Sequence, residues 1–259
     1  GIFDSGLGGL TVAKAIRLAL PTADLFYFGD TARVPYGIKS AESVNRYSLE
    51  ISKYLRHTRN VDMIVAACNT VSATAIPLLN KHFPELTVYD VITAAIERIR
   101  KEAKADARIA VIGTLATIQS GAYEKRLDIA RPDVKVQSIA CPLLVPLAEE
   151  GWIDHPVSRK TIEIYLEPLL LNPPDYLILG CTHYPLFRPL FEEFFKKHPT
   201  ELIDSAETVA HALKKHEKAQ ELEGSGCMDV TVSDYPQRFE PLMKQFLGMK
   251  PDFISRHSF

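Results

Sequence analysis

The stretch Met63-Ile-Val-Ala-Ala-Cys-Asn-Thr70 recurs in form at Tyr176-Leu-Ile-Leu-Gly-Cys-Thr-His183. In each stretch an apolar run leads to a cysteine, and one or two polar residues follow. A continuous apolar run is typical of a strand buried on both faces of a parallel sheet. Each stretch therefore predicts a buried strand that delivers a thiol, Cys68 or Cys181, to the carboxyl edge of a sheet.

Short β-rich runs alternate with amphipathic segments along the whole chain, which predicts βαβ units and an α/β fold with mostly parallel sheets. The expected strands are 25–28, 61–67, 87–92, 108–113, 134–139, 175–180, 201–203 and 228–233. The expected helices are 41–57, 69–80, 93–104, 157–170 and 206–218.

The chain also divides into two similar halves, each of which reaches its cysteine at a comparable distance from an opening strand at residues 1–6 or 109–114. Ligands of such folds bind outside the carboxyl ends of the strands. A duplicated α/β domain would therefore place both thiols in one cleft between the domains.

Charge and composition exclude several functional classes. The 30 Lys and Arg residues nearly balance the 32 Asp and Glu residues, so nucleic acid is not a favoured partner. No apolar stretch is long enough to span a membrane. The four cysteines are widely spread and form no CxxC pair, which favours reduced thiols in a cytoplasmic protein.

Two glycine-containing loops follow the first two expected strands. In Asp4-Ser5-Gly6-Leu-Gly-Gly9 the glycines permit positive φ angles and close backbone approach, and the next helix offers free N–H groups to a carboxylate. We interpret Asp4, an acid at a strand end, as functional. In Gly29-Asp-Thr-Ala-Arg-Val-Pro-Tyr-Gly37, Tyr36 and the adjacent N–H groups are suited to clamping a polar ligand, although an ordinary turn with a surface tyrosine fits equally well.

The cysteines themselves are candidate nucleophiles or acid/base groups. Cys68 precedes the helix expected at 69–80, whose positive end would lower the thiol pKa, while Asn69 and Thr70 either cap that helix or bind a ligand. His183 would orient or protonate the Cys181 thiol. A zinc site formed by these two cysteines and His183 is less favoured, because no compact ligand pair accompanies them.

Supporting candidates lie elsewhere in the second half. Thr114 and Thr117 occupy the strand-end position that corresponds to Asp4 and Ser5. Glu149 and Glu150 would place a carboxylate near the cleft, although a solvated acidic helix end is the more common explanation of such a pair. Cys141 and Cys227 lack polar surroundings of this kind and are interpreted as structural.

Taken together, these motifs resemble the glutamate racemases of the aspartate/glutamate racemase family, which make D-glutamate for peptidoglycan without a cofactor. The matching segments are Phe3–Gly9, Gly29–Gly37, Ala67–Thr70, Gly113–Thr117, Cys141–Pro146 and Leu179–Leu186, in family order over most of the chain.

The resemblance implies that Cys68 and Cys181 are acid/base thiols on opposite faces of the substrate α-carbon, with Asp4 assisting Cys68 and with His183 and Glu149 assisting Cys181. It implies that the amino and carboxylate groups are held by Asp4, Ser5, Tyr36, Gly37, Asn69, Thr70, Thr117, Thr182 and His183. It further implies two domains related by pseudo-twofold symmetry. The first comprises residues 1–92 and 205–259, and the second comprises residues 93–204. It also implies no cofactor and a homodimer.

One departure from the family pattern is Tyr89-Asp90-Val-Ile-Thr93, where the family commonly has a glycine before Val-Ile. This segment is the expected inter-domain crossing, so domain closure and regulation are left open.

Three alternatives remain. A related racemase acting on aspartate or a hydantoin would use the same thiol pair. A two-lobed amino-acid-binding protein would also hold its ligand in a cleft but has no need of paired strand-end thiols. A dithiol redox protein would normally carry a CxxC at the start of a helix, which this chain lacks.

Overall fold

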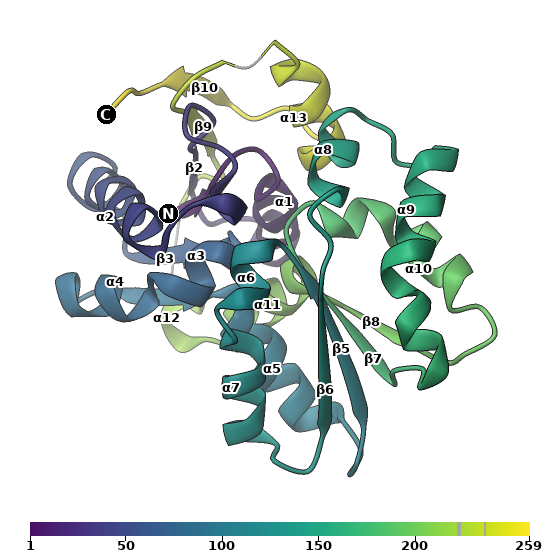
Figure 1. Cartoon of the computed structure of the whole chain (residues 1–259). Coiled ribbons are helices and arrows are strands. Elements are labelled where there is room, and N and C mark those ends of the chain that lie inside the picture. Colours follow the sequence, from purple (N-terminus) through teal and green to yellow (C-terminus); the bar gives the residue numbers. More distant parts are fainter. Residues whose placement is uncertain (222–223, 236) are drawn as a thin grey trace.

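The chain forms two parallel sheets, each covered by helices on both faces, in a computed structural model that describes residues 1–221, 224–235 and 237–259 (Figure 1). The strand order is β10-β9-β2-β1-β3-β4 in the first sheet and β6-β5-β7-β8 in the second. Every adjacent pair of strands is parallel.

The first sheet contains β1 (Ile2–Asp4), β2 (Leu25–Gly29), β3 (Met63–Ala66), β4 (Thr87–Asp90), β9 (Met228–Val232) and β10 (Phe253–Arg256). One face packs against α1 (Leu10–Ala19), α11 (Ser205–Lys214), α12 (Glu217–Gln220) and α13 (Phe239–Leu247). The other face packs against α2 (Ala41–Thr58), α3 (Asn69–Thr74) and α4 (Ile76–His82). A short 3-10 turn, η1 (Tyr36–Ile38), lies between β2 and α2.

The second sheet contains β5 (Arg108–Gly113), β6 (Lys135–Ala140), β7 (Tyr176–Gly180) and β8 (Glu201–Asp204). On one side lie α5 (Val91–Glu102), α6 (Leu115–Gln119) and α7 (Ala122–Ala130). On the other lie α8 (Leu144–Glu149), α9 (Pro156–Leu166), η2 (Glu167–Leu171), η3 (Tyr184–Phe187) and α10 (Arg188–Phe194). Figure 1 shows α5 and α7 to the left of this sheet and α9 and α10 to its right.

Both faces of each sheet are buried, as the apolar strand sequences predict. Ile2 belongs to the core on the α1 side of the first sheet, and its neighbour Phe3 belongs to the core on the α2 side. In β5, Ile112 faces α8 and α9, whereas Val111 faces α5 and α7. Successive side chains of a strand point to opposite faces, so a strand between two helical layers is mostly apolar on both.

The predicted duplication of an α/β domain is confirmed by the strand order. The order β2-β1-β3-β4 recurs as β6-β5-β7-β8, so β3, which precedes Cys68, corresponds to β7, which precedes Cys181. The first sheet has two extra strands, β9 and β10, which follow β8 in sequence. The domain boundaries at residues 92 and 205 stay a prediction.

Several helices and one strand differ from the expectations. The helix expected at 69–80 is two helices, because Pro77 lies in the first turn of α4 and breaks the continuity after Thr74. The helix expected at 157–170 ends at Leu166, just before Pro168, and continues as η2. Strand β10 was not predicted, because it is an edge strand with an exposed phenylalanine, Phe253, and no continuous apolar run.

Within the part of the chain that the structure describes, no helix is both long and apolar enough to cross a membrane.

We expect the Ile112→Ala variant to lose about 2–5 kcal/mol of unfolding free energy, because the side chain is fully buried in the central strand β5. Ile129→Ala is the matched control, since Ile129 is 83% exposed on α7 and its removal should change stability by less than about 0.5 kcal/mol. Urea unfolding followed by circular dichroism measures both. Equal losses in the two variants would contradict this assignment of the core.

Candidate active site

A cavity lies at the carboxyl ends of the strands and is lined by residues from both halves of the chain. Of the residues singled out from the sequence, it is lined by Ser5, Tyr36, Gly37, Cys68, Asn69, Thr70, Thr114, Cys181, Thr182 and His183. The rest of its lining is mostly apolar: Val34, Pro35, Ile38, Leu115, Pro142, Val145 and Pro146. Asp4, Thr117 and Glu149 stand behind this lining and hydrogen bond to, or pack against, residues that form it.

Cys68 is the residue before α3 and is almost completely buried. Its Sγ donates a hydrogen bond to Ser5 Oγ at 3.7 Å. Burial, with the nearby Asp4 carboxylate adding to it, raises the pKa of the thiol to about 12. A backbone hydrogen bond from Val71, in the first turn of α3, does lower this pKa, but burial outweighs it, so the expectation of a net lowering by the helix end is wrong.

Asp4 is the last residue of β1 and has no exposed surface. Its Oδ2 accepts a hydrogen bond from the Gly6 N–H at 3.0 Å, while Oδ1 has no partner among the described residues. Burial raises the pKa of this carboxyl group, and the nearby His183 partly offsets the effect. Asp4 thus lies behind the Ser5–Cys68 side of the cavity, close enough for its charge to raise the pKa of Cys68.

The second thiol, Cys181, contacts a histidine, which in turn contacts a glutamate. Cys181 follows β7, and its Sγ lies 3.8 Å from His183 Nδ1. His183 Nε2 lies 3.2 Å from Glu149 Oε1. Burial lowers the pKa of His183, but the hydrogen bonds to Cys181 and Glu149 outweigh it and raise the value from 6.5 to about 10. This pKa favours the protonated imidazole at neutral pH, which would donate from both nitrogens.

The two glutamates that end α8 have different partners. Glu149 contacts His183, although 38% of its side chain is exposed. Glu150 instead pairs with Arg238 Nη1 at 2.9 Å on the solvent side. The interpretation as a solvated helix end therefore fits Glu150 but not Glu149.

In residues 1–221, 224–235 and 237–259 no three His, Cys, Asp or Glu side chains are arranged to hold a metal ion.

Hydroxyl and amide groups from both halves meet at the cavity. Thr70 Oγ1 lies 3.1 Å from Thr114 Oγ1 and 3.2 Å from Thr117 Oγ1. Thr114 also caps α6 by accepting from the Thr117 N–H. Asn69 Oδ1 accepts from the hydroxyl of Tyr123, a residue of α7 that the sequence analysis missed because no local motif marks it.

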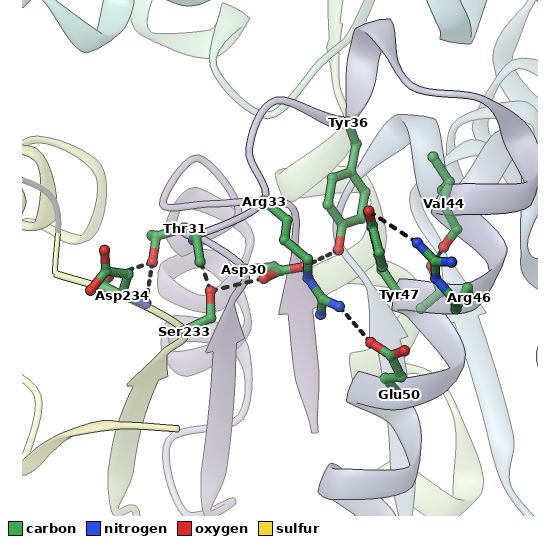
Figure 2. A network of polar contacts seen from close by, with 12 residues as sticks. Asp30, Thr31, Arg33, Tyr36, Val44, Arg46, Tyr47, Glu50, Ser233 and Asp234 are labelled. Atoms are coloured by element: carbon green, nitrogen blue, oxygen red, sulfur yellow. Dashed lines mark hydrogen bonds and ion pairs between the residues drawn. The ribbon is translucent and has the colours of Figure 1, made fainter. Parts of the chain in front are cut away.

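The loop from Asp30 to Gly37 is fixed by a buried carboxylate (Figure 2). Asp30 accepts hydrogen bonds from the Tyr36 hydroxyl, from Arg33 Nε at 2.7 Å and from Ser233 Oγ at 2.8 Å. Tyr36 is fully buried, so the alternative of a surface tyrosine is wrong. Its hydroxyl is also directed to Asp30, which leaves the ring and the backbone of the loop to line the cavity.

The glycines after β1 permit a close contact between the halves. Gly6, Gly8 and Gly9 are not among the described glycines with positive φ, so that part of the expectation is wrong. A Cβ at Gly8 would lie 2.5 Å from Thr182 Oγ1 and 2.6 Å from the His183 ring. A Cβ at Gly37 would likewise lie 2.8 Å from Thr114 Cβ. These positions lack space for a side chain, because there the first half contacts the second directly.

Comparisons with known proteins place this geometry in a family. The family model described as Asp/Glu/Hydantoin racemase matches residues 10–213. A glutamate racemase of Aquifex aeolicus is 46% identical over 96% of this chain and 93% of its own length. The structure of glutamate racemase from Francisella tularensis in complex with D-glutamate superposes with a TM-score of 0.91 at 31% identity, covering 100% of this chain and 96% of that one.

Glutamate racemase from Aquifex pyrophilus gives a TM-score of 0.82 at 41% identity, covering 98% of this chain and 97% of that one. Together, the family model and these relatives cover the segments that carry the motifs and both of the duplicated sheets. This chain belongs to the Asp/Glu/hydantoin racemase family.

Proposed function

We propose that this protein interconverts L- and D-glutamate without a cofactor, with Cys68 and Cys181 as its two acid/base groups. The observation that carries the proposal is the placement of the two thiols. They follow equivalent strands of two sheets, line one cavity and lie close enough for charge on Cys181 to raise the pKa of Cys68. The relatives named glutamate racemase support the choice of substrate.

Racemisation requires that a proton leave one face of the α-carbon and that another arrive at the opposite face. Two thiols, one ionised and one protonated, perform this in either direction by exchanging roles. The α-proton is weakly acidic, so the carbanionic state depends on fixed hydrogen-bond donors in a cavity from which water is largely excluded. The Asn69 amide, the hydroxyls of Thr70 and Thr182 and the backbone of the Asp30–Gly37 loop are the groups that we assign to this role.

The two thiols differ in their electrostatic surroundings. The raised pKa of about 12 keeps Cys68 protonated at neutral pH, which suits a proton donor. The cationic His183 lies beside Cys181, so the positive charge that would stabilise a thiolate is on that side of the cavity. We therefore assign Cys181, supported by His183 and Glu149, as the base of the resting enzyme. Cys68, supported by Ser5 and Asp4, is assigned as the acid.

Aspartate and hydantoins remain the competing substrates, since the family model spans all three. A cytoplasmic role in supplying D-glutamate for peptidoglycan and assembly as a homodimer are further parts of this proposal. They rest on the family resemblance.

Replacing Cys68 or Cys181 by Ala should lower racemisation of both glutamate enantiomers by at least about 10³-fold, because each direction needs both thiols. Cys227→Ala is the control, since Cys227 lies outside the cavity and its loss should leave the activity unchanged. Circular dichroism follows the conversion of the enantiomers. In deuterium oxide the wild-type product should carry solvent deuterium at the α-carbon.

The same deuterium experiment, repeated with aspartate and alanine, tests the choice of glutamate as the substrate. Faster exchange with aspartate than with glutamate would overturn the choice of glutamate, and full activity in either Ala variant would overturn the two-thiol mechanism.

Glu149→Gln should lower the pKa of His183, because it weakens one of the two hydrogen-bonded partners that raise it. In the wild type that pKa of about 10 lies above the ordinary 6.5. Protonation therefore adds stability that is complete below pH 6.5 and is lost as the pH rises through about 10. The variant should lose this stability at lower pH.

Titration of the His183 ring by nuclear magnetic resonance checks the pKa, and Glu150→Gln serves as the control because Glu150 pairs with Arg238 instead. A wild-type imidazole that is already neutral at pH 7 would contradict the assignment of His183 as a cation.

A further inference from the structure

Tyr123 makes a hydrogen bond between the halves that ends on a residue of the cavity. It lies on α7, which covers the second sheet, and its hydroxyl is 2.7 Å from Oδ1 of Asn69, the first residue of α3 on the first sheet. Both side chains are almost completely buried. Tyr123 itself does not line the cavity, whereas Asn69 does.

In the structure the Tyr123 hydroxyl holds the oxygen end of the Asn69 amide. Burial raises the pKa of Tyr123, so its hydroxyl keeps its hydrogen, and it donates this hydrogen to Asn69 Oδ1 while also contacting Ser205. Only the oxygen of the amide can accept that hydrogen. Nδ2 of Asn69 is therefore turned away from Tyr123, and it is buried without a partner among the described residues. An unpaired buried N–H₂ group is unfavourable unless a ligand in the cavity accepts its hydrogens.

The helix that carries Tyr123 is held firmly against α3. One turn further along α7, Arg126 Nη2 donates to the backbone oxygen of Ser72 in α3 at 2.9 Å. Arg126 Nη1 also pairs with Asp90 Oδ1 at 3.1 Å. Asp90 also caps α5 by accepting a hydrogen bond from the Thr93 N–H. Two successive turns of α7 thus contact the helix that begins at Asn69, which leaves the Tyr123 hydroxyl little freedom to move.

We propose that Tyr123 is a positioning residue that holds the Asn69 amide with its N–H groups directed at a carboxylate of the bound amino acid. This inference rests on the proposed function for the identity of the ligand. A carboxylate is the matching acceptor, because it is an acceptor-only group and its hydrogen bonds are charge-assisted. Without the Tyr123 hydroxyl, the amide is free to turn its oxygen toward the ligand, which would repel the carboxylate.

The test is a double-mutant cycle of Tyr123→Phe and Asn69→Ala. Tyr123→Phe should raise KM for both glutamate enantiomers by about 5- to 20-fold with a smaller change in kcat, as expected for the loss of one directed hydrogen bond. In the Asn69→Ala background the same change should leave KM unaltered, because the group through which Tyr123 acts is gone. Equal effects of Tyr123→Phe in both backgrounds would overturn the proposal.

Tyr184→Phe is the matched control. Tyr184 is fully buried, and its hydroxyl donates to the backbone oxygen of Cys141 at 2.8 Å rather than to a side chain of the cavity. Its removal should leave KM within about twofold of the wild type, whereas a rise equal to that in Tyr123→Phe would assign both effects to general loss of packing and overturn the proposal.

A second readout needs no turnover. The side-chain amide signals of Asn69 in a ¹H–¹⁵N spectrum, assigned with the Asn69→Ala variant, should shift in Tyr123→Phe and stay in place in Tyr184→Phe. Unchanged signals in Tyr123→Phe would overturn the positioning role even if the protein acted on another amino acid. If the signals shift in Tyr123→Phe but the wild-type protein does not racemise glutamate, the positioning role is supported and only the proposed function is overturned.

Discussion

The close contact between the two halves is the constraint on which the site depends. Two thiols can address opposite faces of one carbon only if the carboxyl edges of two separate sheets meet at one small cavity. The backbone of the glycine loop fulfils this requirement: at Gly8 it touches Thr182 and His183 so closely that a Cβ would not fit. At Gly37 the backbone of the first half likewise lies against Thr114 of the second half, with no room for a Cβ. The cavity is therefore lined by residues of both halves at once.

The duplication repeats the fold but not the environment of the thiols. Cys68 has Ser5 and a buried carboxyl group near it, whereas Cys181 has the His183 imidazole, which also contacts Glu149. Burial raises the pKa of the first thiol, and the contacts with Cys181 and Glu149 raise the pKa of the imidazole beside the second. A symmetric backbone thus supports unlike surroundings at the two thiols, and on this difference we base the proposal that Cys68 is the proton donor and Cys181 the base.

The two-domain α/β architecture could be predicted from the sequence, because it depends on the local pattern of apolar and polar residues. Apolar runs such as residues 63–67 identify strands buried on both faces, and their repetition indicates the duplicated domain. The Cys68 pKa was misjudged, since burial depends on the whole fold and the helix end is only a local effect. The contacts of Tyr123 with Asn69 and of Asp30 with Ser233 were not predicted for the same reason, because these partners are distant in sequence and no spacing marks them. Edge strand β10 has too little apolar character to be recognised.

The unequal surroundings of the two thiols have a kinetic consequence. Enantiomers of an amino acid have equal free energy in water, so the equilibrium constant of their interconversion is one. The ratio kcat/KM must then be the same in both directions, whatever the protein does to each thiol. With His183 on one side only, the two enantiomers need not bind equally well. The enantiomer that saturates the enzyme at lower concentration must turn over more slowly by the same factor, so the asymmetry of the site sets which enantiomer occupies it most of the time.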